Sequence, residues 1–289
     1  MKLLIIQERG RHEKNREFRE ALCLQRSLSR LGIESTVWGL GYENFSNSFE
    51  IVSKGCDVVL SLENYDTGWH PNISKFEGLR CFWSIDSHCV LHDHVRFCEN
   101  NNIDLLLNSS EQYLPAFKNH VKYAAWFPNG YPSDLITPAK ISRDVDVGFC
   151  GSSINVRNSV MDHIQKEIPI KRDIFVIGED MVRSLSSYRI AFNFNIADDI
   201  NFRTFEAAGA GALVLTNYTP NLEKLFKINE EVVVYESIED CINKMKTLLA
   251  NPELLSKIAV LGYERARSHH TYDSRAKRLV EIVNSIVRL

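Results

Sequence analysis

Short apolar runs alternate with longer amphipathic stretches along the first half of the chain. The segment 15–31 places Phe18, Leu24 and Leu28 at helical spacing, which predicts an amphipathic helix that ends at Gly32. Because the short runs are apolar throughout, they suit strands that are covered on both faces. This alternation predicts a parallel sheet with helices on both sides. The strands are expected at residues 3–6, 35–38, 56–60, 80–83, 104–107 and 121–125, with a helix from Ser110 between the last two.

The densest group of turn-forming residues lies at 127–138, where prolines and a glycine follow one another closely. A second series of apolar runs and helical patterns begins after it. We therefore expect two α/β domains, at residues 1–138 and 139–270, and a separate last helix at 271–289. The second series predicts strands at 145–149, 174–177, 190–194, 212–215 and 232–235, and closing helices at 237–249, 253–268 and 271–287.

One segment, from Asn201 to Thr216, carries the clearest chemical signal. A short helix there places Arg203 and Glu206 three residues apart, so both side chains point to one side. Gly209 and Gly211 are expected to end the helix before a buried strand. An arginine can bind a phosphate through two hydrogen bonds, and a glutamate can accept hydrogen bonds from a sugar diol.

The residues R-T-F-E-A-A-G-A-G-A-L-V-L-T-N, together with E-E-V-V-V-Y-E-S-I-E-D and G-Y-E-R-A-R-S-H-H-T-Y-D-S-R-A, resemble the C-terminal half of group-one glycosyltransferases. The CgeB-like, spore-maturation-protein-like branch is the most similar. The resemblance implies a GT-B architecture: two Rossmann-like domains face a cleft, and the last helix crosses back to the N-terminal domain. It implies a nucleoside-diphosphate sugar, with a UDP-sugar expected, as co-substrate, and no cofactor.

In retaining members of that family, an acidic residue stands eight positions before the glutamate. Asp198 occupies this position relative to Glu206, where the family more often has glutamate, and Asp199 is one residue out of register. The resemblance implies that Asp198 lies near the donor sugar and that Glu206 lies near the ribose. The alternative for Asp198 is a solvated loop, and the alternative for Arg203 is a surface ion pair with Glu206.

Two further turns of the second domain are expected to contact the donor. A Gly151-Ser152 turn follows a strand and precedes Arg157, an arrangement suited to a diphosphate. The resemblance places Gly178 and Glu179 beside the nucleotide base. For the Gly151-Ser152 turn, the alternative is a tight turn followed by a surface arginine. For Gly178 and Glu179, the alternative is that the acidic charge only stabilises the start of a helix through the helix dipole.

In the first domain, the polar loop after the first strand offers Gly10, His12 and Asn15 as weak candidates for the acceptor side or the donor phosphates. Polar residues also follow the strand at 80–83. There the resemblance gives His88 the place of a residue that contacts the donor sugar, with Asp86 orienting it or touching the acceptor. The spacing of His88 and His92 also allows a metal site. We expect no metal, because no distant pair of ligands completes a site.

The overall composition is that of an ordinary globular protein. The net charge of −3 excludes a strong bulk attraction to nucleic acid, and no apolar run is long enough to span a bilayer. An odd number of cysteines, 7, without a C-x-x-C motif indicates the reducing cytoplasm.

We therefore expect a retaining, metal-independent glycosyltransferase with an unknown acceptor: a glycan, a glycolipid, a protein or a modified nucleic acid. The two alternatives are a non-catalytic nucleotide-sugar binding module and a sugar-nucleotide epimerase or hydrolase. The oligomeric state stays open.

Overall fold

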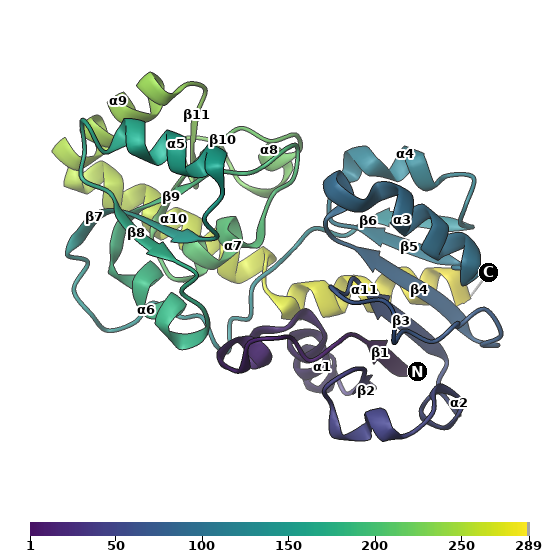
Figure 1. The fold of residues 1–289 in the computed structure, drawn as a ribbon. Coiled ribbons are helices and arrows are strands. Elements are labelled where there is room, and N and C mark those ends of the chain that lie inside the picture. The colour runs from purple at the N-terminus through teal and green to yellow at the C-terminus, as the bar shows by residue number, and fades with distance from the viewer. Residues whose placement is uncertain (288–289) are drawn as a thin grey trace. The chain divides into compact units, whose positions relative to one another are not determined.

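The computed structural model describes residues 1–287. These residues form two compact units (Figure 1). The first unit comprises Met1–Asn129 and the C-terminal helix that begins at Tyr272, and the second comprises Gly130–Thr271. Within the described residues, no helix combines the length and the apolar character needed to cross a membrane.

The first unit is built on a six-stranded parallel sheet in the order β2-β1-β3-β4-β5-β6. Its strands are β1 (Lys2–Ile6), β2 (Glu34–Trp38), β3 (Val58–Leu62), β4 (Leu79–Ser84), β5 (Leu105–Asn108) and β6 (Tyr123–Trp126). Its helices are α1 (Glu20–Arg30), α2 (Phe49–Val52), α3 (Ser87–Asn100), α4 (Leu114–Phe117) and α11 (Tyr272–Val287), with 3-10 turns η1 (Glu13–Phe18), η2 (Glu43–Ser46) and η3 (Glu111–Tyr113).

The C-terminal helix α11 belongs to the first unit, as the resemblance implied. It packs against α1, and Arg30 forms an ion pair with Asp273 at 2.6 Å. The buried Arg275 donates to the carbonyl of Pro128 at 2.7 Å and to that of Asn129 at 2.8 Å. These contacts fix the helix to the end of the segment that follows β6.

The second unit is built on a five-stranded parallel sheet in the order β11-β10-β9-β7-β8. Its strands are β7 (Val145–Gly151), β8 (Lys171–Ile174), β9 (Tyr188–Asn193), β10 (Leu213–Asn217) and β11 (Val233–Tyr235). Its helices are α5 (Asn155–Ile164), α6 (Gly178–Ser187), α7 (Phe202–Gly209), α8 (Leu222–Leu225), α9 (Ile238–Ala250) and α10 (Pro252–His269).

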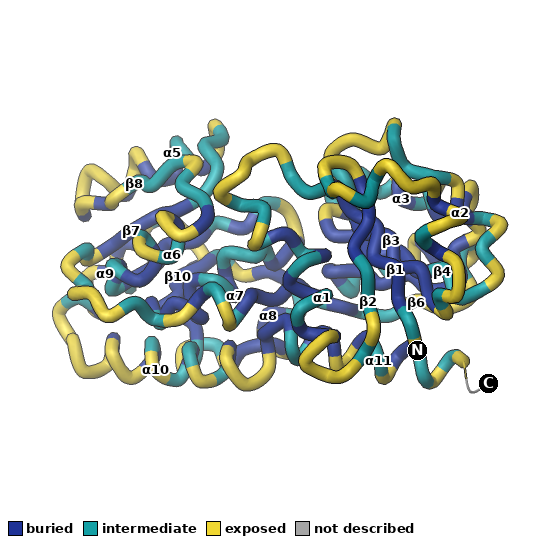
Figure 2. The backbone as a smooth tube through the Cα atoms, turned by 90° about the horizontal axis from the view of Figure 1, so that it is seen from below, coloured by how far each residue is buried: buried dark blue, intermediate teal, exposed yellow. Residues whose placement is uncertain are grey.

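Each unit has its own apolar core, and the central strands are the most buried segments (Figure 2). In the first unit, Leu4, Val59 and Leu106 of the sheet pack with Trp38 and Phe117. In the second, the core joins side chains of four strands to α5 and α9, among them Ile190, Leu213, Met161 and Met245. Burial of two continuous apolar surfaces is the main stabilising term in each unit.

Three expectations from the sequence are wrong in detail. The edge strand β8 covers 171–174 and not 174–177: Phe175 has a left-handed φ of 54° and is 69% exposed, so the apolar run beyond Ile174 leaves the sheet. The helix expected over 15–31 is a 3-10 turn followed by α1, because Arg19 between them has extended backbone angles. After Ser110 there are only two short turns of helix, η3 and α4.

The end of α7 is shaped by two glycines with different roles. Gly211 has a φ of 78°, and the backbone N–H groups of Gly211 and Ala212 donate to the carbonyls of Ala208 and Ala207. This pattern is the Schellman motif, which satisfies the last helical carbonyls. Gly209, in contrast, makes room for Tyr131: a Cβ atom at Gly209 would lie 2.3 Å from the ring of Tyr131.

This close approach predicts that Gly209→Ala destabilises the protein by about 1–3 kcal/mol, although alanine is the better helix former. Urea unfolding followed by circular dichroism measures the change. Gly68→Ala is the matched control, because a Cβ at Gly68 meets only a side-chain oxygen at 3.4 Å. Equal stability of the two variants would contradict the packing argument.

Candidate functional site

In parallel α/β sheets, ligands bind at the carboxyl edge where the strand order reverses, because the loops on either side of that point diverge. In the second unit this point lies between β7 and β9. The side chain of Arg157 spans it. Its Nη1 donates to Ser152 Oγ at 2.8 Å, after β7, and its Nε and Nη2 donate to the carbonyl of Phe194 at 3.2 and 3.1 Å, after β9.

Two guanidinium groups lie close together at this edge. Burial is the main cause that lowers the pKa of Arg157, which is 9% exposed, and the neighbouring charge of Arg203 lowers it further. Burial is also the largest single influence on the pKa of Arg203 and acts to lower it, but Glu206, Cys150 and Tyr188 together raise this pKa above its ordinary value. Two neighbouring cations, of which only Arg203 is paired with a carboxylate, leave excess positive charge that an anionic ligand would neutralise.

Arg203 and Glu206 form an ion pair along one face of α7. Arg203 Nη1 lies 2.8 Å from Glu206 Oε2, and the side chains are only 18% and 14% exposed. The buried Nε of Arg203 has no hydrogen-bond partner among the described residues. The ion pair between Arg203 and Glu206, which was the alternative to a role in phosphate binding, is therefore present. It is more buried than an ordinary surface ion pair. The Nε–H group of Arg203 is left without a hydrogen-bond acceptor among the described residues.

The loop before α7 is held by a buried network of amides and hydroxyls that the sequence did not reveal. Asn193 Nδ2 lies within 3.1–3.2 Å of oxygen atoms of Asn195, Thr204 and Thr216. Asn195 Oδ1 accepts from the backbone N–H of Asn201 at 3.2 Å, and Asn201 Oδ1 accepts from that of Thr204 at 3.2 Å as the cap of α7. The network fixes the start of the helix that carries Arg203 and Glu206.

The acidic candidates Asp198 and Asp199 lie in this same loop. Asp198 is exposed and Asp199 is 5% exposed, and the preceding Ala197 has a left-handed φ of 53°. A non-glycine residue in this region costs energy and needs surrounding structure to hold it, which the buried network supplies. Buried residues therefore hold the conformation of this loop, while Asp198 itself is exposed to solvent.

The other predicted donor contacts lie at the same edge. Gly151 ends β7 and Ser152 follows it, and no side chain caps the N-terminus of α5, so its first N–H groups have no side-chain acceptor among residues 1–287. Gly178 begins α6 with a left-handed φ of 64°, and Glu179 is exposed in its first turn. A helix N-terminus without a cap is suited to an anion.

In the first unit, the equivalent reversal point lies between β1 and β3. Gln7 spans it: its Nε2 donates to Glu20 at 2.7 Å and lies 3.3 Å from the carbonyl of Glu63. The weak candidates lie in the loop after β1. Gly10 has a φ of 91°, His12 is exposed, and Asn15 lies half-buried in η1.

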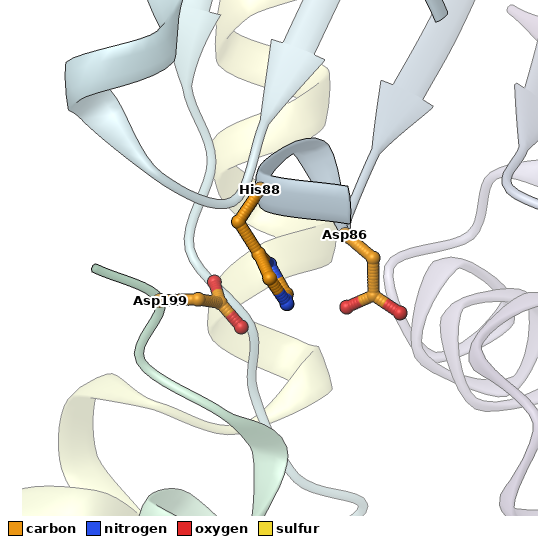
Figure 3. A group of neighbouring side chains, drawn as sticks. All are labelled: Asp86, His88 and Asp199. Carbon is orange, nitrogen blue, oxygen red and sulfur yellow. The ribbon is translucent and has the colours of Figure 1, made fainter. Parts of the chain in front are cut away.

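Asp86 and His88 lie at the start of α3, where both side chains project from the helix end; Figure 3 draws them with Asp199 of the second unit. Asp86 is exposed and His88 is half-buried. The helix is broken at Val90, which has a φ of −131°. The interruption removes the regular spacing that would place His88 and His92 on one helix face.

A chain of hydrogen bonds beside these residues was not foreseen from the sequence either. Glu63 Oε2 accepts from the backbone N–H groups of Ile85 and Asp86 at 3.0 and 2.8 Å, so this carboxylate holds the segment that enters α3. Burial, followed by the charge of Asp86, raises the pKa of Glu63 to about 7. His94 Nε2 lies 3.5 Å from the same oxygen, and its Nδ1 lies 2.8 Å from Ser84 Oγ. The one feature of the sequence that could have indicated this chain is a glutamate, Glu63, directly after a buried strand.

Comparison with known proteins decides the family. Residues 134–281 match the model of a family described as "Glycosyl transferase-like". The chain belongs to this glycosyltransferase-like family. The match spans more than half of the sequence, including β7 to β11 and the arginine pair. No curated protein sequence is detectably similar to the chain.

Solved structures of glycosyltransferases share the fold over the whole length. A sucrose-phosphate synthase from Thermosynechococcus elongatus superposes with a TM-score of 0.69 at 11% identity, covering 99% of each chain. HepE from Anabaena in complex with UDP gives 0.62 at 11% identity, covering 99% of this chain and all of the other. An α-glucosyltransferase in complex with UDP-glucose and DNA gives 0.68 at 10% identity, covering 98% and 99%.

These matches confirm the expected GT-B fold and the expected enzyme class, a glycosyltransferase. The roles of the individual site residues stay predictions.

The environment of Glu63 predicts a pH-dependent effect of Glu63→Gln. The folded-state pKa of about 7 lies above the ordinary value of 4.5, so the folded protein binds a proton that the unfolded chain releases between these values. Wild-type stability therefore falls as pH rises through this interval. Glutamine does not titrate and keeps an oxygen for the α3 N–H groups. Relative to wild type, the variant should gain about 1–3 kcal/mol between pH 4.5 and 8.

Urea unfolding at a series of pH values measures this gain. Glu43→Gln is the matched control, because Glu43 is exposed and should show no such trend. If the wild-type and Glu63→Gln curves are parallel across this pH range, the assignment of a raised pKa to Glu63 is wrong.

Proposed function

We propose that the protein transfers a sugar from a UDP-sugar to an acceptor, with retention of anomeric configuration and without a metal ion or other cofactor. The observation that carries this proposal is the pair of guanidinium groups, Arg157 and Arg203, at the reversal point of the second sheet. Several solved structures with this fold are complexes with UDP, which supports the choice of nucleotide. Motif resemblance also favours the CgeB-like branch, and we propose a cytoplasmic location.

The leaving group of the reaction is a nucleoside diphosphate, and its negative charge grows as the glycosidic bond breaks. Arg157 and Arg203 would stabilise that charge, together with Ser152 and the uncapped N-terminus of α5 beyond Gly151. Glu206 would accept hydrogen bonds from the ribose hydroxyls. Gly178 and Glu179 would border the base.

The sugar itself would be oriented by acidic and imidazole groups. Asp198, held on the loop before α7, would accept from sugar hydroxyls, and His88 would contact the donor sugar from the first unit. The acceptor side would include His12, Asn15 and Asp86, and Gly10 would border the donor. The acceptor remains one of four classes: a glycan, a glycolipid, a protein or a modified nucleic acid.

The first experiment compares nucleoside-diphosphate sugars by thermal shift, since a ligand that binds only the folded state raises the melting temperature. We expect the largest shift with a UDP-sugar, followed by release of UDP when an acceptor is present. Binding without turnover would instead indicate a non-catalytic binding module. A changed sugar still attached to UDP would indicate an epimerase.

Arg203 tests the phosphate assignment. Lysine cannot reproduce two parallel hydrogen bonds, so Arg203→Lys should weaken UDP binding about tenfold and Arg203→Ala about a hundredfold. Isothermal titration calorimetry measures both. The control is Arg189→Ala, which removes an arginine that pairs with the exposed Asp146 and should leave UDP affinity unchanged. If the Arg203→Ala variant binds UDP with wild-type affinity, Arg203 does not contact the phosphates and serves only in the ion pair on α7.

Metal independence makes a separate prediction. Because two arginines would neutralise the diphosphate, treatment with EDTA should leave the rate of UDP release from a UDP-sugar within about twofold of the untreated rate. Loss of activity that manganese or magnesium restores would show that a cation, and not the arginine pair, neutralises the leaving diphosphate.

A further inference from the structure

The first unit contains a cavity of about 410 Å³ beside the carboxyl ends of β3 and β4. It lies between the segment that follows β3 and the outer side of α3. The residues that matter for its chemistry are Glu63, Tyr65, Thr67, His70, His94 and Phe97. All of them belong to the first unit, so the cavity is complete within it.

Aromatic rings form much of the wall. The rings of Phe82 and Phe97 lie 4.6 Å apart between centroids, and the ring of His70 meets Phe97 edge-on at 5.0 Å. Tyr65 and Thr67 lie at the exposed side. A mostly apolar wall with a few oriented polar groups is typical of pockets for small molecules. A sugar ring has an apolar C–H face that suits such a wall, and its hydroxyls need polar partners.

Both histidines of the cavity are held in the neutral form. His70 Nδ1 donates to the carbonyl of Pro71 at 2.8 Å and its Nε2 accepts from the Ser61 hydroxyl at 2.7 Å, while burial lowers the pKa of His70 to about 4. Burial lowers the pKa of His94 to about 4 as well. Neither ring therefore supplies positive charge at neutral pH.

The hydrogen-bond chain behind His94 has one consistent direction. Asn108 Nδ2 donates to Ser87 Oγ at 2.8 Å, Ser87 Oγ lies 2.5 Å from Ser84 Oγ, and Ser84 Oγ lies 2.8 Å from His94 Nδ1. Each hydroxyl finds an acceptor in this chain when Ser87 donates to Ser84 and Ser84 donates to His94. With the protons assigned in this way, the N–H group of the neutral His94 ring is on Nε2, toward Glu63.

Glu63 is the main acceptor that the cavity offers. Its Oε2 accepts from two backbone N–H groups, whereas its Oε1 has no hydrogen-bond partner among residues 1–287. The cation at the rim, Arg96, already lies 3.7 Å from Asp93. An anionic ligand would meet Glu63 and find no unpaired cation among the described lining residues, while a hydroxyl would find an acceptor.

We propose that this cavity is a carbohydrate subsite that binds a neutral glycosyl unit of the acceptor, with Glu63 accepting a hydrogen bond from a sugar hydroxyl. The inference rests on the proposed function, because the donor would occupy the second unit. Among the four acceptor classes, it selects those that carry sugar: a glycan, or the glycan part of a larger acceptor.

The test is saturation-transfer NMR on the full chain, without donor. The probes are methyl glycosides of glucose, galactose, mannose and N-acetylglucosamine, and inorganic phosphate is titrated separately by calorimetry as the anionic comparison. At least one glycoside should bind the wild-type protein. At pH 8, above the pKa of Glu63, Glu63→Gln should weaken that binding about tenfold, as expected for loss of one hydrogen bond to a charged group. Thr67→Trp should abolish it, because the exposed Thr67 tolerates a large side chain that fills the cavity.

Glu43→Gln is the control and should bind like wild type. The proposal is overturned if no glycoside binds, if both cavity variants bind like wild type, or if phosphate binds in the cavity and the glycosides do not. UDP binding is measured on the same samples to distinguish failure of this proposal from failure of the proposed function. If UDP binds and no glycoside binds, the carbohydrate subsite is rejected and the proposed function is not. Melting temperatures confirm that each variant is folded.

Discussion

The buried network of Asn193, Asn195, Asn201, Thr204 and Thr216 is the constraint on which the candidate donor site depends. All of these residues except Asn201 are buried, so their amides and hydroxyls must find partners within the protein. The loop after β9 adopts an arrangement that satisfies these groups together. That arrangement caps α7, holds the left-handed backbone at Ala197 and gives Arg203 and Glu206 a fixed starting point.

In the first unit, a carboxyl group instead of an amide network fixes the segment that leads into a helix. At its carboxyl edge, the Glu63 carboxylate binds the N–H groups that lead into α3, and Gln7 joins the ends of β1 and β3. A carboxylate in a buried position is costly, which is the reason for its raised pKa. The arginine pair beside the neutral network of the second unit suits an anionic ligand, whereas the acidic edge of the first unit suits a hydroxyl-rich one.

The strands and most helices could be predicted from the sequence, because a strand buried on both faces of a parallel sheet is apolar throughout and can be recognised by that run alone. The pairing of Arg203 with Glu206 could be predicted as well, since it follows from helical spacing alone. The burial of Arg157 could not, because its guanidinium is held by the carbonyl of Phe194, 37 residues away. The partners of Asn193 and Asn195 include residues up to 24 positions away, so these amides resemble ordinary loop residues in the sequence. Strand β8 was misplaced because pairing with β7, and not hydrophobicity, sets the limits of an edge strand.

A crystal structure of the protein with UDP is the most direct test of the central claim, that the reversal point of the second sheet is a nucleotide-sugar site. The account predicts diphosphate oxygens within hydrogen-bond distance of both Arg157 and Arg203, and the ribose diol against the Glu206 carboxylate. A complex in which UDP binds the folded protein with its diphosphate away from both arginines would contradict it.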